Sequence, residues 1–221
     1  MKTKIFDVLP STNEYAETHD FLEDTAIIAR EQTGGKGTKG RSFSSLKGGV
    51  YLSLVRLMSC KAADSFSLMV ASCMAVVKTL ESYGVKAQIK WANDVFVNGK
   101  KICGILIKNV FEGDYVKKSI TGIGVNVNNE IPPELQSIAI NLKSLIGKVD
   151  TDEFSKKLIE NLYKHYSIDD YRSYNMVLGR RITVIDGEKT YTATASDISP
   201  NGNLVLSDGR ILSHGEVTIR L

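Results

Sequence analysis

Apolar residues recur at intervals of three and four in two stretches of the chain, and this spacing predicts amphipathic helices. Between residues 64 and 83 the apolar stripe consists of Phe66, Met69, Val70, Cys73, Val77 and Leu80. We expect Gly84 to end this helix. A later stripe consists of Phe154, Leu158, Leu162 and Tyr166. A short helix is also expected over residues 12–19, because Ser11 can cap it and Glu14 can complete a capping box.

Shorter apolar runs bounded by turn residues predict the strands in the first part of the chain. A buried strand covers residues 26–29 and runs into Glu31 and Gln32. Further strands are expected at 49–58, 85–91, 95–97, 101–108 and 119–128. Asn98-Gly99, between two of these strands, is typical of a two-residue hairpin turn. Residues 33–45, rich in Gly, Ser and Lys, are expected to form a loop.

Beyond about residue 176 the pattern changes to short strands separated by turn residues. Strands are expected near 181–186, 190–197, 203–206, 210–213 and 216–220. The turns between them contain Asp186-Gly187, Asn201-Gly202 and Asp208-Gly209. Such regular short strands favour a small barrel. We therefore expect an α+β body at 1–176 and a compact β domain at 177–221.

Composition and charge favour an ordinary soluble globular protein. The 221 residues are 43% hydrophobic and 24% charged, and 28 Lys and Arg against 25 Asp and Glu leave a net charge of +3. This balance excludes a disordered chain and gives little reason to expect a nucleic-acid partner. The three cysteines and three histidines lack the spacing of a disulfide framework or a zinc site, so no protein-held transition metal is expected. Without a signal peptide or an apolar stretch of transmembrane length, we expect a cytoplasmic protein that does not enter a membrane.

The loop at 33–45 contains the one cluster of positive charge, Lys36, Lys39 and Arg41, among four glycines. Gly35 to Gly40 matches the G-x-G-x-x-G dinucleotide pattern, and Gly35 to Ser42 nearly matches a P-loop. Both motifs must open a helix, whereas this run leads into an expected strand. Exposed backbone N–H groups and three cations can wrap a phosphate or a carboxylate. A flexible, solvated basic loop explains the pattern equally well.

Three further segments place chemistry-bearing residues at strand ends, where sites are commonly built. Lys90-Trp91-Ala92-Asn93-Asp94 puts a cation near a carboxylate, a pairing suited to a phosphate and its Mg²⁺. Lys101 opens a strand in which Gly104 allows close approach to the backbone, and this lysine can supply a fixed charge to an oxyanion. Residues 122–128 carry glycines and asparagines on one strand face. Taken singly, the segments also fit structural roles: a turn with a half-buried Trp, a solvated hairpin end, and a strand thinned for packing.

In order and separation, these segments and Ser11-Thr12-Asn13 resemble the motifs of the biotin protein ligase family. The family pattern is S-T-N, G-R-G-R-x-G-R, K-W-P-N-D, K-x-x-G-I-L and G-I-G-x-N-V-N, and the matching segments are 11–13, 35–41, 90–94, 101–106 and 122–128. The resemblance covers essentially the whole chain. It implies a mixed sheet flanked by helices, related to class II aminoacyl-tRNA synthetases, followed by a small SH3-like barrel. Because S-T-N lies close to residue 1, we expect a short form without the N-terminal DNA-binding domain of some members, and no nucleic-acid partner.

The resemblance implies overlapping sets of site residues. The biotin-binding set is Ser11, Thr12, Asn13, Gln32, Gly35, Lys36, Gly37, Thr38, Lys101, Gly104, Leu106 and Gly122. The ATP-binding set is Lys36, Lys39, Arg41, Lys90, Trp91, Asn93, Asp94 and Asn126. The catalytic residues implied are Lys101, Lys36 and Arg41, and the residue implied to hold Mg²⁺ is Asp94.

The implied reaction has two steps. Biotin is activated with ATP to biotinyl-5′-AMP, and it is then transferred to a lysine of a biotin carboxyl carrier domain, of the acetyl-CoA carboxylase type. A carboxylate is a poor nucleophile toward an anionic triphosphate, so the site must hold both together and neutralise charge. The expected ligands are biotin, ATP and Mg²⁺, and the expected protein partner is the carrier domain. Monomer and homodimer are both left open.

The chain departs from the family pattern at a few positions. Lys36 and Thr38 replace arginines of the loop, and Thr38 loses a charge that would help to retain the adenylate. Phe43 stands where a Trp is usual, and Ala92 replaces the proline of K-W-P-N-D. We expect these changes to tune the enzyme rather than to disable it.

Two other functions stay open at this point. A lipoate ligase or octanoyltransferase would share the fold, and Gly48-Gly49-Val50-Tyr51 faintly resembles its glycine motif, although Leu52-Ser53 stands where that family has a histidine and a Gly-Asn pair. A non-catalytic RNA- or protein-binding module would use the basic loop and the β tail. The net charge of +3 and the lack of a basic strand interleaved with aromatic residues argue against such a module.

Overall fold

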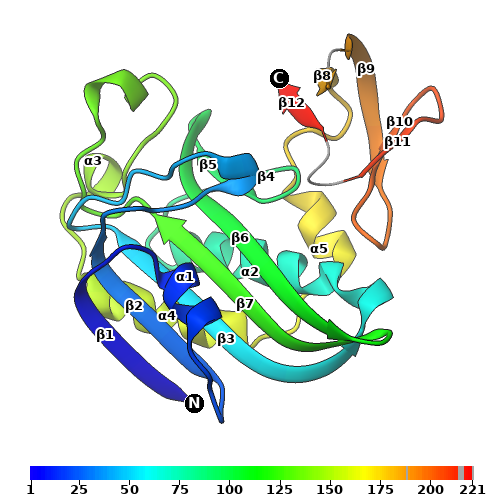
Figure 1. Cartoon of the computed structure of the whole chain (residues 1–221). Coiled ribbons are helices and arrows are strands. Elements are labelled where there is room, and N and C mark those ends of the chain that lie inside the picture. Colours follow the sequence, from blue (N-terminus) through cyan, green and yellow to red (C-terminus); the bar gives the residue numbers. More distant parts are fainter. Residues whose placement is uncertain (188, 214–216, 221) are drawn as a thin grey trace.

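Two sheets organise the protein (Figure 1). The computed structural model describes residues 1–187, 189–213 and 217–220, with residue 39 described by its backbone alone. A seven-stranded mixed sheet has the order β1-β2-β3-β7-β6-β5-β4, and a five-stranded sheet has the order β11-β10-β9-β8-β12. The expected fold class is confirmed: a helix-flanked mixed sheet is followed by a small β unit.

The first sheet consists of β1 (Lys2–Leu9), β2 (Thr25–Gln32), β3 (Val50–Lys61), β4 (Gln88–Lys90), β5 (Asp94–Val97), β6 (Lys100–Glu112) and β7 (Tyr115–Val125). β1 and β2 run parallel, and the other neighbouring pairs are antiparallel. In the turn from β5 to β6, φ is 50° at Asn98 and 74° at Gly99. Both values are positive, as the predicted two-residue hairpin turn requires.

Helices cover both faces of this sheet. α2 (Phe66–Glu81) and α4 (Thr151–Leu162) lie on one face, where they contact β6 and β3, and α1 (Thr12–Thr18) lies on the other against β3 and β7. Alternation along β3 serves both faces: Leu54 joins the main core with the helical residue Leu80, while Val55 packs with Ala16 of α1. Both predicted apolar stripes therefore form helices that bury most of their residues, although Met69 is only partly buried and Tyr166 lies beyond the end of α4.

The start of α1 follows its sequence signal in part. The Ser11 hydroxyl accepts a hydrogen bond from the Glu14 N–H at 3.4 Å, as an N-cap should. The Glu14 carboxylate does not complete the expected capping box, because it forms an ion pair with Lys36 Nζ at 3.1 Å. A first-turn residue thus contacts the loop at 33–45.

One strand and two α-helices have no counterpart among the sequence predictions: β1, α3 (Lys143–Ile146) and α5 (Ile168–Ser173). β1 is an edge strand with charged residues along it, and its apolar residues Ile5 and Val8 are more than half exposed. Its pattern therefore resembles a surface segment, and only pairing with β2 makes it a strand. α5 is a short helix that begins with a capping box between Ser167 and Asp170.

The second sheet contains β8 (Arg181–Asp186), β9 (Lys189–Ile198), β10 (Leu204–Leu206), β11 (Ile211–Leu212) and β12 (Thr218–Arg220). Each lies where a strand was expected, although the predicted start of the last strand at 216 lies outside the described residues. Its pairs are antiparallel. Ile182, Ala195 and Leu204 belong to the same core cluster as α2, so the two sheets share one hydrophobic core.

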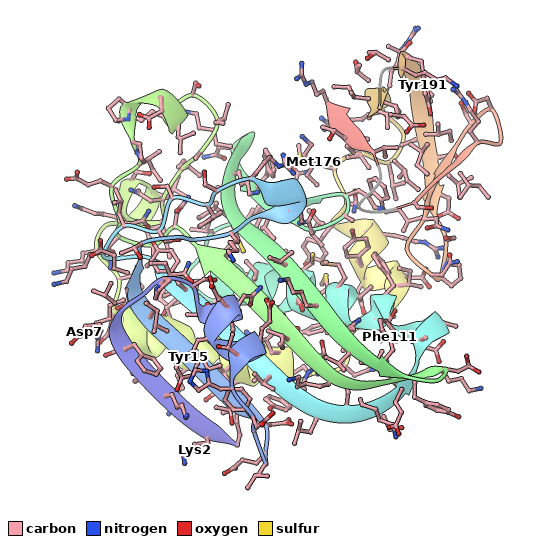
Figure 2. All side chains as sticks on the ribbon, viewed as in Figure 1. Lys2, Asp7, Tyr15, Phe111, Met176 and Tyr191 are labelled. Atoms are coloured by element: carbon pink, nitrogen blue, oxygen red, sulfur yellow. The ribbon has the colours of Figure 1, made fainter. Side chains whose placement is uncertain are left out.

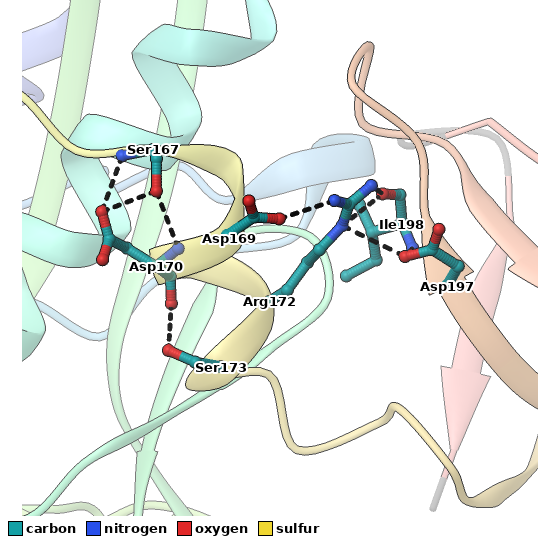
Figure 3. A network of polar contacts seen from close by, with 7 residues as sticks. All are labelled: Ser167, Asp169, Asp170, Arg172, Ser173, Asp197 and Ile198. Carbon is teal, nitrogen blue, oxygen red and sulfur yellow. Dashed lines mark hydrogen bonds and ion pairs between the residues drawn. The ribbon is translucent and has the colours of Figure 1, made fainter.

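Polar contacts join the second sheet to the first part of the chain, and Figure 3 shows those between α5 and β9. Arg172 of α5 donates from Nε to the Ile198 carbonyl at 2.8 Å and forms ion pairs with Asp169 and Asp197 at 2.8 and 3.1 Å. Met176, which Figure 2 shows between the two parts, donates its N–H to the Ile89 carbonyl at 2.8 Å. Trp91 Nε1 donates to the Gly202 carbonyl at 2.9 Å. The segment at 90–94 is therefore anchored to the second sheet.

By length and composition, Ala62–Glu81 in the described part of the chain is apolar enough to cross a membrane. From the sequence, we had expected no apolar segment of transmembrane length. However, 61% of its most apolar window is buried inside the protein, where α2 packs against the sheet. This burial is what a core helix requires.

Gly202→Ala is expected to weaken the junction of the two sheets. Its φ is +87°, and an added Cβ would lie 2.2 Å from the Phe66 ring. We expect the free energy of unfolding, measured by urea titration, to fall by about 2 kcal/mol or more. Gly209→Ala is the matched control, because Gly209 has a φ of +86° but no atom within 4 Å of the added Cβ. Equal losses in the two variants would contradict the packing argument.

Candidate functional site

A cavity of about 1180 Å³ lies over the face of the first sheet that carries α1. Its walls come from the start of α1, the loop at 33–45, the segment at 90–94, the strands β6 and β7, residues 131–139 and β12. The sequence-predicted residues that line it are Ser11, Thr12, Asn13, Gln32, Lys36, Gly37, Thr38, Arg41, Lys90, Trp91, Asn93, Asp94, Lys101, Gly104, Leu106, Gly122 and Asn126. Gly35 lies behind the wall, and the side chain of Lys39 lies outside the described residues. Segments far apart in the sequence therefore converge on one space.

Ser11, Thr12 and Asn13 are nearly buried at one end of the cavity. Thr12 donates its N–H and its hydroxyl to Gln32 Oε1 at 2.8 and 3.1 Å. The Ser53 hydroxyl of β3 lies 2.8 Å from Thr12 Oγ1 and 2.6 Å from Asn13 Oδ1. This end of the cavity is thus lined with polar groups that lie within hydrogen-bonding distance of one another.

Glycines keep the floor of the cavity open. A Cβ on Gly122 would lie 2.3 Å from Asn13 Oδ1, and one on Gly124 would lie 2.7 Å from the Phe43 ring. Gly104 also faces the Phe43 ring, with an ideal Cβ position 3.4 Å away. Gly122 and Gly124 therefore accept no larger residue without displacing a side chain that lines the cavity, whereas at Gly104 the nearest atom to an added Cβ is Lys101 Nζ at 3.1 Å.

The loop at 33–45 folds back along one wall. Bridges between Gln32 and Ser45 and between Lys36 and Ser42 give it a hairpin form, with a short 3-10 turn at Thr38–Gly40. Arg41 donates from Nη2 to Thr38 Oγ1 at 2.9 Å and from Nε to the Thr38 carbonyl at 3.2 Å. The residue that replaces a family arginine therefore holds the next arginine in place.

Positive charge dominates the cavity. Among the described residues that line it, Lys36, Arg41, Lys90, Lys101 and Arg220 are cationic, and Asp94 is the only carboxylate. Lys101 Nζ forms an ion pair with Asp94 Oδ1 at 2.6 Å. Burial lowers the pKa of Lys90, the nearby carboxylate of Asp94 opposes this effect, and the cations Lys101, Arg41 and Arg220 lower the pKa further. Such a site favours a multiply charged anion.

The uncharged members of the predicted ATP-binding set, Trp91, Asn93 and Asn126, also have protein partners. Trp91 donates to the second sheet, as described above, and Asn93 Nδ2 donates to the Ile105 carbonyl at 2.7 Å. Asn126 Oδ1 accepts from Asn129 Nδ2 at 3.0 Å. These groups therefore shape the walls of the cavity whether or not they also contact a ligand.

Several lining or supporting residues were absent from the sequence predictions. Ser53 and Ser45 support the polar end, and Arg220 enters the cavity from β12. A single serine within the mostly apolar run at 50–55 is the only sequence signal for Ser53. Phe43 had been noted only as a departure from a family pattern, yet its ring lies against Gly124. Arg220 carries no local signal, because its role depends on how the two sheets meet.

The donor set fits Mg²⁺ only as an ion that takes most of its ligands from a nucleotide. Within residues 1–187, 189–213 and 217–220 there is no group of three or more His, Cys, Asp or Glu side chains that could hold a metal. One oxygen of Asp94 contacts Lys101, so the other is the carboxylate oxygen available. One carboxylate together with substrate phosphates is a common arrangement for Mg²⁺.

The fold and the site define a class II aminoacyl-tRNA synthetase-like ligase, with a cationic cavity on a mixed sheet and a small β unit beside it. A model of the "Biotin/lipoate A/B protein ligase family" matches residues 5–128, and a model of the "Biotin protein ligase C terminal domain" matches residues 177–220. The chain belongs to the biotin/lipoate A/B protein ligase family. The resemblance inferred from the five motifs is thereby confirmed.

Individual relatives agree with this assignment. The chain is 32% identical over 219 residues to the bifunctional ligase/repressor BirA of Bacillus subtilis, covering 90% of this chain and 67% of the relative. It is 26% identical to the biotin–[acetyl-CoA-carboxylase] ligase of Mycobacterium tuberculosis, covering 89% of this chain and 79% of the relative. Among solved structures, the biotin protein ligase of Aquifex aeolicus in complex with biotin and ATP has a TM-score of 0.80 and 27% identity, covering 99% of this chain and 98% of that one.

Lys90→Met is expected to stabilise the free protein at neutral pH. Because the pKa of Lys90 is lowered in the folded state, the unfolded state binds the lysine proton more tightly. At any pH below the lowered pKa, Lys90 is charged in the folded wild-type protein, and the burial of this charge lowers the stability by its full amount. That cost disappears as the pH rises through the lowered pKa toward 10.5, the ordinary lysine value. Thermal unfolding should therefore show a higher Tm for the variant than for the wild-type protein at pH 7. This difference in Tm should become smaller toward pH 10. A difference that widens with pH would refute the assignment.

Proposed function

We propose that this chain is an ATP-dependent biotin protein ligase. It activates biotin to biotinyl-5′-AMP and transfers biotin to a lysine of a biotin carboxyl carrier domain, of the acetyl-CoA carboxylase type. The observation that carries this proposal is the convergence of a polar, hydrogen-bonded pocket and a strongly cationic region in one cavity, with Lys101 Nζ held by Asp94 at 2.6 Å. Two relatives, both named biotin–[acetyl-CoA-carboxylase] ligase, support the choice of acceptor.

The biotin end of the cavity is proposed to be the polar pocket at the start of α1. Ser11, Thr12, Asn13 and Gln32 offer hydrogen-bonding groups to a ureido ring, which has both N–H donors and a carbonyl acceptor. Lys36, Gly37 and Thr38 of the loop close over it, with Gly35 packed behind them, and Gly104, Leu106 and Gly122 form the floor. The carboxylate of the ligand then points toward Lys101.

The nucleotide is proposed to lie at the cationic end. Lys36, Arg41 and Lys90 supply charge to the phosphates, and Trp91, Asn93, Asp94 and Asn126 shape that part of the wall. Lys39 belongs to this set by the resemblance alone. A triphosphate carries roughly four negative charges, and fixed cations in a partly buried site stabilise it without reorganisation during the reaction. Mg²⁺, when bound through Asp94 and phosphate oxygens, supplies further neutralisation of the phosphates.

The proposed positions of biotin and ATP allow both steps of the reaction. A biotin carboxylate oxygen attacks the α-phosphorus, the bond to the β-phosphate oxygen breaks, and pyrophosphate leaves. In the second step the neutral amine of the acceptor lysine attacks the carbonyl carbon, the bond to the phosphate oxygen breaks, and AMP leaves while the nitrogen loses a proton. Lys101, Lys36 and Arg41 stabilise the charge that develops at the phosphorus. Closure of the loop at 33–45 keeps water from the mixed anhydride.

The division of the chain belongs to the same proposal. A catalytic domain at 1–176 and a C-terminal SH3-like β domain at 177–221 agree with the two sheets and with the separate family match at 177–220. We also place the activity in the cytoplasm, because three free cysteines suit a reducing compartment.

A lipoate or octanoate ligase or transferase is the alternative, because the matched family includes lipoate proteins. The match of residues 177–220 to a biotin protein ligase C-terminal domain favours biotin. Purified protein incubated with biotin, Mg²⁺ and ATP labelled at the α-phosphate should form an adenylate and biotinylate an added carrier domain. Excess lipoate or octanoate should not compete. Formation of neither product, or efficient competition by lipoate, would overturn the proposal.

Lys101→Ala is expected to slow adenylate formation by about 100-fold or more, since one fixed charge at the developing anion is lost. Lys100→Ala is the matched control: Lys100 is the adjacent residue, and its Nζ donates to the Gln136 carbonyl at 2.7 Å at an exposed position. The measurement is the rate of pyrophosphate release in the presence of biotin and without carrier domain. If both variants retained the wild-type rate, Lys101 would have no part in activation.

A further inference from the structure

A chain of hydrogen-bonding groups connects the polar pocket to the loop at 33–45. It begins at Asn13 Oδ1, 2.6 Å from Ser53 Oγ, which in turn lies 2.8 Å from Thr12 Oγ1. Thr12 Oγ1 lies 3.1 Å from Gln32 Oε1, and Gln32 Nε2 donates to Ser45 Oγ at 2.9 Å. Ser45 donates to the carbonyl of Phe43 at 3.0 Å. No single segment contains this relay, because its members come from α1, β2, β3 and the loop.

The first half of the relay has too few protons. Asn13 Oδ1 and Gln32 Oε1 only accept, whereas Ser53 and Thr12 have one hydroxyl proton each. The three oxygen–oxygen contacts therefore share two protons, and one contact has none. Ser53 is fully buried and Thr12 is nearly so, which makes the missing proton costly.

Rotation of the Asn13 amide by half a turn resolves the shortage. Asn13 Nδ2 then donates to Ser53, Ser53 donates to Thr12, and Thr12 donates to Gln32, so every contact has one proton and all donors point toward the loop. The rotation also moves Nδ2 away from the Leu106 carbonyl, to which it donates at 3.4 Å, and leaves Oδ1 in its place. A ligand N–H that donates to Asn13 Oδ1 compensates for the lost hydrogen bond to the Leu106 carbonyl.

The far end of the relay reaches the reaction centre. The Phe43 carbonyl accepts from Ser45, and the Phe43 ring lies against Gly124 and Gly104. Lys101 Nζ lies 5.9 Å from the centre of the same ring. Gly35 is packed tightly behind the relay, because its added Cβ would lie 2.5 Å from Ser45 Oγ. A fixed Ser45 therefore fixes both the base of the loop and the ring beside Lys101.

We propose that Ser53 and Ser45 are positioning residues: a ligand N–H that binds Asn13 aligns the relay, and the aligned relay holds the loop at 33–45 closed beside Lys101. The inference rests on the proposed function, since the ureido ring of biotin supplies the N–H. On this proposal, the two serines couple the biotin pocket to the loop although neither of them contacts the ligand.

Limited trypsin digestion of the full chain tests this coupling, because Lys36 and Arg41 make the loop a cleavage site. Biotin should slow cleavage of the wild-type loop. In Ser45→Ala this protection should fall by about fivefold, the change expected for one neutral hydrogen bond, while the Kd for biotin, measured by calorimetry, changes less. Ser53→Ala should lose protection and also bind biotin more weakly, since Ser53 orients Asn13 directly.

Gln32→Glu is a second variant with nearly the same shape. It keeps an acceptor for Thr12 but removes the N–H that Ser45 accepts, so protection should again fall. Ser72→Ala is the matched control: its hydroxyl is fully buried and donates to the Leu68 carbonyl at 2.5 Å on α2, outside the relay. It should keep wild-type protection.

The outcomes separate the two proposals. A wild-type protein that binds no biotin removes the proposed function. A wild-type protein that binds biotin without protection of the loop, full protection in Ser45→Ala, or equal losses in Ser45→Ala and Ser72→Ala each overturn the relay while leaving the ligase proposal intact.

Discussion

The site depends on the absence of side chains at three positions in the two central strands. Gly104 of β6 and Gly122 and Gly124 of β7 leave a strip of bare backbone at the middle of a sheet whose other residues are mostly bulky. Two side chains from other segments occupy this strip: Asn13 lies over Gly122, and Phe43 lies over Gly124 and Gly104. A sheet normally excludes such close approach, because its own side chains stand upright on both faces. The bare strip lets a helix terminus and a loop meet on the sheet and enclose a cavity.

The second constraint is electrostatic. The described residues that line the cavity include five cations and one carboxylate, and the pair formed by Lys101 and Asp94 offsets only part of that imbalance. Burial and the neighbouring cations both lower the pKa of Lys90 despite Asp94, which means that the empty cavity holds charge at a cost. An anion in the cavity offsets this cost by its attraction for the same cations. The same cations that strain the free protein therefore favour a polyanionic ligand.

The sequence predicted the elements whose information is local. The apolar stripes of α2 and α4, the Asn98-Gly99 turn and the strands of the second sheet are all determined by short-range spacing, and the structure contains them. The resemblance to a family located the cavity residues, because it carries information about three-dimensional proximity that spacing does not. β1 was not predicted, since an edge strand with little burial has no clear alternation. Ser53 and Arg220 were not predicted either, since each acquires its place only when distant segments pack together.

Thr38 shows how a departure from a family pattern can be read once the contacts are known. Loss of an arginine removes one positive charge from the loop, which weakens the attraction for an anion. The Thr38 hydroxyl and carbonyl, however, accept two hydrogen bonds from Arg41, which restrict a side chain that would otherwise lose considerable rotamer entropy on binding. The loop thus has one positive charge fewer, but the Arg41 side chain that it keeps is held in place. Since affinity depends on the interaction energy less the cost of ordering the groups that make it, the substitution has opposing effects on the binding of an anion.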